Sequence, residues 1–356
     1  MSGTSLDGVD AVLVDFSQPK PSISCNYFLP YPQQLKQDIL RLQHPAENEL
    51  EHQALIANQL AELYAQTVQA LLQKSGNTAS DIRAIGCHGQ TIRHRPELGF
   101  TMQIGNNALL AELTDISVVG DFRSRDVAAG GHGAPLVPAF HQAIFAHPQK
   151  NRVIVNIGGI ANITYLGKDG QVFGFDSGPG NMLLDHWIKL RLDKDYDEDG
   201  AWAATGIVHT LFLQNMLAEP YFSLPPPKST GRDLFNDIWL QSHILYPHCR
   251  PQDIARTLVA LTAHSIVLAI QKTCDEVDEI YICGGGAHNR LLMADLQELL
   301  SNIPIATTNQ LGVDVDWVEA VAFAWLAKQT LDGNSGNLPE VTGAKGKRIL
   351  GSIYPH

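Results

Sequence analysis

The sequence predicts an α/β protein with mixed sheets that is divided into two similar lobes. At 356 residues the chain is long enough for about two domains. Each half opens on a glycine-rich turn beside an apolar strand, first at residues 3–16 and again at residues 153–166. Strands then alternate with segments whose apolar residues recur at helical spacing, which is typical of α/β layers.

In the first half, a strand, a long helix, a short strand, a second helix and a third strand follow one another. They are predicted at residues 9–16, 50–72, 82–87, 106–113 and 116–119. A loop rich in glycine, arginine and histidine comes next, at residues 120–138. We expect the lobe boundary in this loop and the end of the chain back in the first lobe. The first lobe is therefore placed at residues 1–125 and 331–356, and the second at residues 126–330.

In the second half, two strands joined by a glycine turn precede a third strand and a helix that ends near Leu192. The strands are predicted at residues 153–156, 161–166, 172–175 and 279–283. Further helices are predicted at residues 254–271, 289–300 and 317–330.

Composition excludes several classes of protein. The formal net charge is −12, with 17% charged and 44% hydrophobic residues, so the chain is neither disordered nor suited to nucleic acid. Five scattered cysteines without a C-x-x-C pair are typical of reduced thiols in the cytoplasm. No apolar run approaches the ~18 residues of a membrane span, and the polar N-terminus is not a signal peptide. We expect a soluble cytoplasmic enzyme or binding protein.

Two glycine-rich turns are candidate phosphate-binding sites. In Gly3-Thr4-Ser5-Leu6-Asp7-Gly8, the glycines let backbone N–H groups approach a phosphate and the two hydroxyls add donors. Asp7 can hold a magnesium-bound water there. Gly158-Gly159 forms the second turn, which could hold phosphates from the opposite side. The alternative for each turn is an ordinary hairpin connection.

Gly284-Gly285-Gly286 lies between a predicted strand and a predicted helix. Three glycines remove every Cβ atom from a place where a nucleotide base or ribose can lie. The alternative is a tight strand–helix connection, although such connections rarely need three glycines. The spacing is not G-x-G-x-x-G, so it does not indicate a dinucleotide.

Asp176 is the strongest candidate for chemistry. It stands where an apolar strand is predicted to end, and a carboxylate there can take a proton from an attacking water or hydroxyl in phosphoryl transfer. The equally weighted alternative is structural, because aspartate is a common helix N-cap and Pro179 suits a first helical turn. We interpret Asp185 as a helix-surface residue or a support for the site. No cluster has the spacing of a protein-held transition metal.

Eight blocks in order resemble anhydro-N-acetylmuramic acid kinase over essentially the whole chain. The blocks are residues 1–10 (MSGTSLDGVD), 88–91 (HGQT), 120–123 (GDFR), 130–135 (GGHGAP), 156–162 (NIGGIAN), 175–181 (FDSGPGN), 227–232 (PKSTGR) and 283–289 (CGGGAHN). The resemblance implies a two-lobed actin/hexokinase-like (ribonuclease H-like) fold with a cleft between the lobes. It also implies that water opens the 1,6-anhydro ring while ATP phosphorylates O6. The product is N-acetylmuramic acid 6-phosphate, made during peptidoglycan recycling.

The resemblance also implies roles for individual residues. Asp176 would be the base that activates the water. ATP, with Mg²⁺, would be held by Gly3, Thr4, Ser5, Asp7, Gly8, Asp10, Asn156, Gly158, Gly159, Gly284, Gly285, Gly286 and Asn289. Thr91, Arg123, His132 and Glu319 are expected to contact the sugar; a solvated Arg–Asp loop and a helix-dipole carboxylate are the alternatives for Arg123 and Glu319.

Partners and rival functions complete the prediction. We expect a small amino-sugar substrate, no nucleic acid and no membrane, with a homodimer left open. The rivals are an ordinary sugar kinase of the same fold without ring hydrolysis and a non-catalytic ATP-binding regulator.

The sequence departs from the family in one respect. A strand normally precedes the Met-Ser-Gly-Thr-Ser turn, so the first hairpin here lacks a strand and leaves one edge unpaired. We expect residues to precede Met1.

Overall fold

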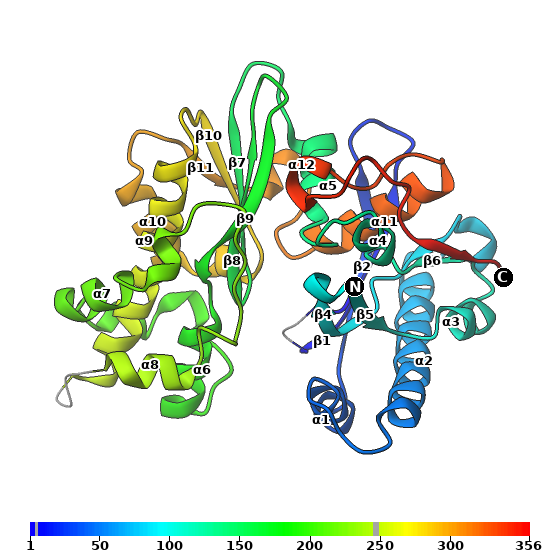
Figure 1. Cartoon of the computed structure of the whole chain (residues 1–356), viewed down its shortest axis with the longest axis horizontal. Helices are drawn as coiled ribbons and strands as arrows, with labels where there is room; N and C mark the ends of the chain where they lie inside the picture. The colour runs from blue at the N-terminus through cyan, green and yellow to red at the C-terminus, as the bar shows by residue number, and fades with distance from the viewer. Residues whose placement is uncertain (4–5, 245–248) are drawn as a thin grey trace. The chain divides into compact units, whose positions relative to one another are not determined.

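The computed structural model describes residues 1–3, 6–244 and 249–356 and divides into two compact units (Figure 1). Unit 1 comprises Met1–Ile144 and Trp317–His356, and unit 2 comprises Phe145–Asp316. The α/β class with mixed sheets is confirmed. The bounds of the units differ from the expected lobes, because residues 126–144 and 317–330 belong to unit 1. The end of the chain lies in unit 1, where its last strand joins a sheet.

Unit 2 is built on one five-stranded sheet with the order β11-β10-β7-β8-β9. The strands are β7 (Arg152–Ile157), β8 (Ile160–Leu166), β9 (Val172–Pro179), β10 (Glu279–Cys283) and β11 (Ile305–Thr307). Strand β8 is antiparallel to β7 and β9, whereas β10 is parallel to both β7 and β11. The order by sequence within the unit is thus 3-2-1-4-5 with an antiparallel second strand, as in ribonuclease H-like domains.

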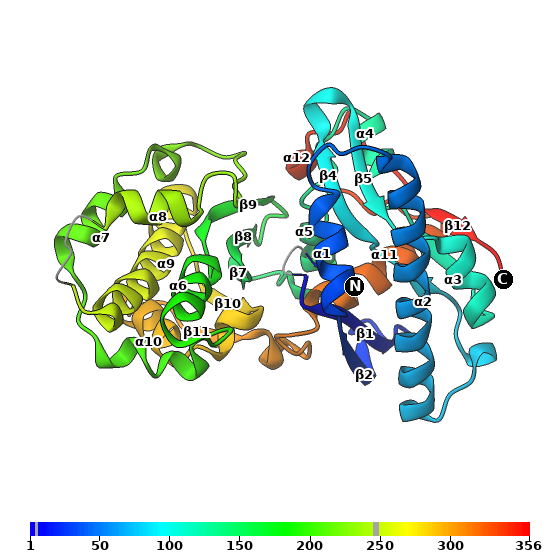
Figure 2. The same cartoon turned by 90° about the horizontal axis from the view of Figure 1, so that it is seen from below.

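Helices gather on one side of this sheet (Figures 1 and 2). They are α6 (Met182–Leu192), α7 (Thr210–Leu217), α8 (Asp237–His243), α9 (Pro251–Thr273) and α10 (Arg290–Leu299). Helix α9 contacts β8, β9, α6, α7 and α10, and most of its residues are buried. It is also the one helix among the described residues that is long and apolar enough to cross a membrane, and 83% of its most apolar window is buried. That burial is typical of a core helix.

The described residues of unit 1 form three small sheets. Strands β1 (Gly8–Asp15) and β2 (Ser22–Pro30) form a hairpin, as do β4 (Gln90–Arg95) and β5 (Phe100–Ile104). Strand β6 (Val118–Gly120) lies between β3 (Ile85–Gly86) and β12 (Ser352–Tyr354). The helices are α1 (Gln33–Arg41), α2 (Glu49–Ser75), α3 (Asn107–Thr114), α4 (Ser124–Ala128), α5 (Val137–Phe145), α11 (Val318–Leu331) and α12 (Pro339–Thr342). The long α2 contacts α1, α3 and the β1–β2 hairpin, which closes a core around Ile39 and Leu60 (Figure 2).

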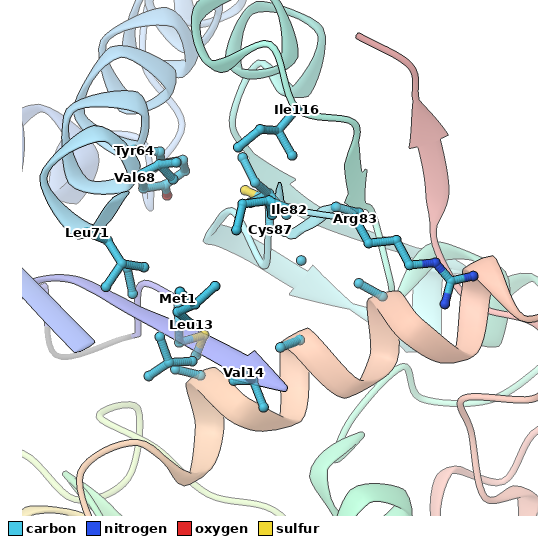
Figure 3. Close-up of a pocket in the computed structure, with 18 of the residues that line it drawn as sticks. Met1, Leu13, Val14, Tyr64, Val68, Leu71, Ile82, Arg83, Cys87 and Ile116 are labelled. Carbon is cyan, nitrogen blue, oxygen red and sulfur yellow. The ribbon is translucent and has the colours of Figure 1, made fainter. Parts of the chain in front are cut away.

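A cavity of about 480 Å³ separates β1 from residues 81–89 within unit 1 (Figure 3). Helix α2 lines it with Tyr64 and Leu71, and α11 lines it with alanines. Among the described residues β1 pairs only with β2, in agreement with the expected unpaired edge. The Met1 amino group donates to the Asp10 carbonyl oxygen at 2.7 Å, and the Asp10 N–H donates to the Met1 carbonyl oxygen at 2.8 Å. This reciprocal pair is the first rung of an antiparallel ladder that points along the cavity.

We expect an apolar strand joined to the Met1 nitrogen to fill this cavity and stabilise unit 1. Six alternating Val, Ile and Thr residues span roughly 20 Å, and burying two or three of their side chains contributes about 1.5–3 kcal/mol each. The melting temperature, measured by calorimetry, should then rise by about 5 °C or more. A Gly-Ser extension of equal length is the control and should leave it unchanged. Equal melting temperatures for both extended proteins would contradict the expectation.

Candidate active site

Three turns meet at one edge of the sheet in unit 2. Strands β7, β9 and β10 run in the same direction, so their carboxyl ends lie at the same edge, where α/β proteins usually place ligands. The turns that follow contain Gly158-Gly159, Gly180-Asn181 and Gly284-Gly285. The Asn181 N–H donates to the Gly158 carbonyl oxygen at 2.8 Å, and the Gly180 N–H donates to that of Gly159 at 2.9 Å. The sequence-predicted glycines of this unit are therefore brought together.

Some of these glycines are required by the protein itself. Gly284 has a φ of +77°, and a Cβ atom there would lie 2.4 Å from the Asn156 side-chain oxygen. A Cβ atom on Gly286 would lie 2.3 Å from the Ile157 side chain, and one on Gly180 would lie 2.3 Å from the Gly158 carbonyl oxygen. These positions accept only glycine because backbone and side chains pack against them.

Gly158, Gly159 and Gly285 are different. None has a left-handed φ, and a Cβ atom on any of them would have its nearest neighbour at 3.7 Å, an ordinary contact. The surrounding protein would therefore accept a side chain at all three positions. Their lack of one keeps backbone at the sheet edge open to close approach from outside, which is the property a phosphate or ribose site needs.

Asn289 is the N-cap residue of helix α10. Its side-chain oxygen accepts the Leu292 N–H at 3.0 Å and so caps the N-terminus of α10. Asn156 lies at the end of β7 and packs its side-chain oxygen where a Cβ atom of Gly284 would stand. Both residues thus support the glycine turns from within unit 2.

The first glycine turn belongs to unit 1, and Thr4 and Ser5 lie outside the described residues. Asp7 is exposed and accepts the Gly8 N–H at 3.0 Å, and Asp10 is half-buried in β1. The Gly3 carbonyl oxygen accepts from the Gln90 side chain at 3.2 Å. Gly8 is required sterically, since a Cβ atom there would lie 2.4 Å from the Leu29 carbonyl oxygen.

Asp176 lies inside β9, not at its end. The expected strand at residues 172–175 continues to Pro179, and Asp176 pairs with Asn162. The register shifts between Ala161 and Asn162, which leaves Ser177 outside the ladder as a bulge, a feature common next to active sites. The N-cap of α6 is Asn181, so the interpretation of Asp176 as a helix cap is wrong.

The Asp176 carboxyl group is buried among a small set of polar groups. Its Oδ2 accepts the Thr230 N–H at 3.0 Å, and its own N–H donates to the Lys228 carbonyl oxygen at 3.2 Å. The Tyr221 hydroxyl donates to the Asp176 carbonyl oxygen at 2.7 Å. Burial raises the pKa of Asp176 to about 6, against the opposing effects of the Thr230 N–H and the Lys228 charge. A carboxylate with this pKa suits a general base near neutral pH.

Lys228 and Thr230 were not among the residues predicted for the site. The Lys228 ammonium group donates to the Tyr221 carbonyl oxygen at 3.1 Å and lies 4.6 Å from the centre of the Tyr221 ring. Burial and the nearby Lys272 lower the pKa of Lys228. The available signal was the block at residues 227–232, whose contact with Asp176 spans about fifty positions of sequence.

Asp185, in the first turn of α6, is a further carboxyl group, and it is half-buried. Burial raises its pKa to about 7, and the charge of Arg232 opposes that shift. The raised pKa distinguishes Asp185 from a fully solvated carboxylate, and its role in supporting the site stays a prediction.

Arg123 and His88 form the polar centre of unit 1. The Arg123 Nη2 donates to the His88 Nε2 at 3.0 Å, and the His88 Nδ1 is 3.1 Å from the Ser2 carbonyl oxygen. Burial and the Arg123 charge hold the pKa of His88 well below its usual range, so the imidazole is neutral and donates from Nδ1. Burial lowers the pKa of Arg123 to about 10, which leaves a charged guanidinium in the interior, partly balanced by Glu319.

The other predicted sugar contacts lie around this pair. Thr91 on β4 accepts the Gln103 side-chain N–H at 3.2 Å, and His132 is exposed. The charges of Arg123 and His132 lower the pKa of His94, after the larger effect of burial. Glu319, in the first turn of α11, acts on Arg123. Arg123, His132 and Glu319 therefore share one polar neighbourhood of unit 1, and Thr91 lies on β4, the strand that also carries His94.

A glycine-lined sheet edge with a buried carboxylate is typical of α/β proteins that bind phosphates. The whole chain, residues 1–356, matches the family model described as anhydro-N-acetylmuramic acid kinase. The protein of that description from Nitrosospira multiformis is 55% identical over 100% of this chain and 97% of its own. The one from Nitrosomonas europaea is 54% identical over 100% and 98%. The chain belongs to the anhydro-N-acetylmuramic acid kinase family.

Among solved structures, the activator of 2-hydroxyisocaproyl-CoA dehydratase from Clostridium difficile is 14% identical, with a TM-score of 0.40. The match covers 76% of this chain and 83% of that one. A likeness this low bears on neither the fold nor the ligand.

The charge of Lys228 should control the titration of Asp176. In Lys228→Met the positive charge is gone, so we expect the pKa of Asp176 to rise above about 6. The carbon-13 shift of its carboxyl carbon, followed against pH in labelled protein, measures this. Lys168→Met, which removes an exposed lysine paired with Glu276, is the control and should change nothing. An unchanged midpoint in Lys228→Met would show that the Lys228 charge does not act on the Asp176 carboxyl group.

Proposed function

We propose that this chain is an ATP-dependent kinase that opens 1,6-anhydro-N-acetylmuramic acid with water and phosphorylates O6. The observation that carries the proposal is the Asp176 carboxyl group, buried, poised near neutral pH and held through Oδ2 by the Thr230 N–H. It lies on the strand that ends beside the open glycines. The product, N-acetylmuramic acid 6-phosphate, would serve peptidoglycan recycling. The five cysteines, all in the described part of the chain, form no disulfide, which suits a reaction in the reducing cytoplasm.

In this proposal Asp176 takes a proton from water as the water oxygen bonds to the anomeric carbon. The bond from that carbon to O6 breaks, and O6 bonds to the γ-phosphorus while the bond to the ADP oxygen breaks. O6 keeps the electron pair of the broken ring bond and is therefore the phosphoryl acceptor. The sugar gains one water and one phosphoryl group, and the proton on Asp176 returns to solvent.

ATP suits the glycine turns because their backbone N–H groups are the donors that phosphates need. We assign phosphates to Gly3, Gly8, Gly158 and Gly159, and the adenosine to the turn at Gly284–Gly286, where Gly285 is open. Mg²⁺, when bound, neutralises charge on the phosphates. Asp7 and Asp10 would hold it, because one or two carboxylates with phosphate oxygens are its usual ligands and Asp7 is exposed.

The sugar is assigned to Thr91, Arg123, His132 and Glu319. Arg123 is half-buried and charged, and its guanidinium is fixed by donating hydrogen bonds to the Gly133 carbonyl oxygen at 2.8 Å and to His88 Nε2 at 3.0 Å. A fixed, desolvated guanidinium suits the carboxylate of a muramic acid. Glu319 and Thr91 offer acceptors for sugar hydroxyls.

Product analysis tests the function directly. The protein is incubated with ATP and the anhydro-sugar in ¹⁸O-water, and the molecular mass of the product is measured by mass spectrometry. Ring opening with phosphorylation adds about 100 Da in ¹⁸O-water and about 98 Da in ordinary water, whereas phosphorylation alone adds about 80 Da in either. We expect the larger gain, with the label at C1. The smaller gain would indicate an ordinary sugar kinase, and nucleotide binding without ADP release would indicate a regulator.

Replacing the base should stop turnover without weakening nucleotide binding. In Asp176→Asn we expect kcat to fall by about 10³-fold, because the amide cannot accept the proton, with the ATP dissociation constant changed less than about twofold. The control is Asp193→Asn: this side chain is 92% exposed, and its left-handed backbone, with φ of 53°, suits asparagine. Turnover by Asp176→Asn near the unsubstituted rate would refute the assignment.

The pH dependence of kcat should report the same carboxyl group. The base works only when ionised, so protonation below its pKa of about 6 removes activity. We expect kcat to fall about tenfold for each pH unit below that midpoint and to be level just above it. Rates at constant ionic strength measure this. An acid limb centred near the ordinary aspartate value of about 4 would contradict the role given to Asp176.

A further inference from the structure

The hydroxyl of Thr230 is buried and, within the part of the chain that the structure describes, has no hydrogen-bond partner. An unpaired buried hydroxyl is unfavourable, and most such groups in folded proteins have a protein or water partner. A valine would fill the same space without that cost. The hydroxyl therefore points to something that the protein atoms themselves do not supply.

The position of this hydroxyl is fixed relative to the Asp176 carboxylate. The N–H of Thr230 itself donates to Asp176 Oδ2 at 3.0 Å. A threonine hydroxyl oxygen lies roughly 3 Å from its own backbone nitrogen, so Oγ1 stands within a few ångströms of the carboxylate. The segment is anchored at Lys228, whose carbonyl oxygen accepts the Asp176 N–H and whose ammonium group donates to the Tyr221 carbonyl oxygen.

The two oxygens of the Asp176 carboxylate have different surroundings. The Thr230 N–H occupies Oδ2, which leaves Oδ1 as the oxygen better placed to accept a proton. A hydroxyl beside a carboxylate is a common arrangement for holding a small oxygen species, because it can both donate and accept. The Lys228 carbonyl oxygen already bonds to Asp176, and the Lys228 ammonium group bonds to Tyr221.

We propose that the Thr230 hydroxyl holds the attacking water together with Asp176. The carboxylate accepts one O–H of the water, and the threonine hydroxyl hydrogen-bonds the water oxygen, so that a lone pair is directed at the anomeric carbon. Thr230 exchanges no proton in the step. The proposal rests on the proposed function, because it needs water to be the nucleophile.

The test uses three variants of the full chain. Thr230→Val keeps the shape and the backbone N–H but removes the hydroxyl, so kcat should fall about 10- to 100-fold. The KM values for ATP and the anhydro-sugar should change less than about twofold, and the acid limb of kcat should stay near pH 6, since the Asp176 contact with the N–H remains. Thr230→Ser should restore most of the rate. Ser229→Ala, which removes the neighbouring exposed hydroxyl, should match the unsubstituted protein.

The outcomes separate the two proposals. If the unsubstituted protein adds no water to the sugar, the proposed function fails and the role of Thr230 fails with it. If it adds water and Thr230→Val keeps the full rate, only the role of Thr230 is wrong. A shifted acid limb, or failure of Thr230→Ser to recover, would show that Thr230 only supports the local structure. Should Thr230→Val not fold, Thr230→Ala removes the same hydroxyl without crowding and is judged by the same measurements.

Discussion

The shared direction of β7, β9 and β10 is the constraint on which the site of unit 2 depends. Because the three strands run the same way, the turns after them emerge at one edge, although about 125 positions of sequence separate the first turn from the last. The register of β8 against β9 matters equally, since a slip of one residue would turn every side chain to the other face. Tyr165 and Phe173 pair across that ladder and stack at 4.9 Å, and Phe175 continues the stack. Core packing therefore fixes which way Asp176 points.

Burial affects the main polar group of each unit, an acidic group in unit 2 and a basic group in unit 1. In unit 2 it raises the pKa of the Asp176 carboxyl group, and in unit 1 it lowers that of the Arg123 guanidinium. Both groups have hydrogen bonds. Asp176 accepts one from the Thr230 N–H, and Arg123 donates one to the neutral His88. Desolvation thus produces a base that can exchange a proton near neutral pH and a cation that cannot, which are the properties that proton transfer and anion recognition respectively require.

The sequence predicted most of the elements that carry these groups. Strand β10 was predicted with its exact bounds, and α9 and α11 within three residues at each end. These elements were found because their apolar content is high, since most of their residues are buried. Hairpin β4–β5 and strand β2 were missed because half-exposed strands with polar residues give a weak alternating signal. The unit boundary was misplaced because packing, not composition, assigns α5 and α11 to unit 1.

For the site, sequence could select residue types but not their surroundings. The end of β9 was predicted at Phe175 because the Gly-Pro-Gly run after Asp176 looks like a turn, whereas the bulge at Ser177 lets the ladder continue. The contact of Thr230 with Asp176 crosses 54 positions and leaves no local pattern. Family resemblance marked both blocks, yet only the fold shows that they meet.

The three consecutive glycines after β10 illustrate why pattern alone could not decide between a ligand site and a tight turn. The structure shows that the three positions differ: packing requires glycine at two of them, and the ligand role of the third stays a prediction. Gly284 and Gly286 are needed because Asn156 and Ile157 occupy the space a side chain would take, so they answer to packing inside the unit. Gly285 stands between them with an ordinary φ, and a Cβ atom there would meet nothing closer than 3.7 Å, as is also true of Gly158 and Gly159. A glycine that the surrounding protein does not require sterically is a better candidate for contact with a ligand. By this criterion, three of the five candidate glycines of unit 2 remain: Gly158, Gly159 and Gly285.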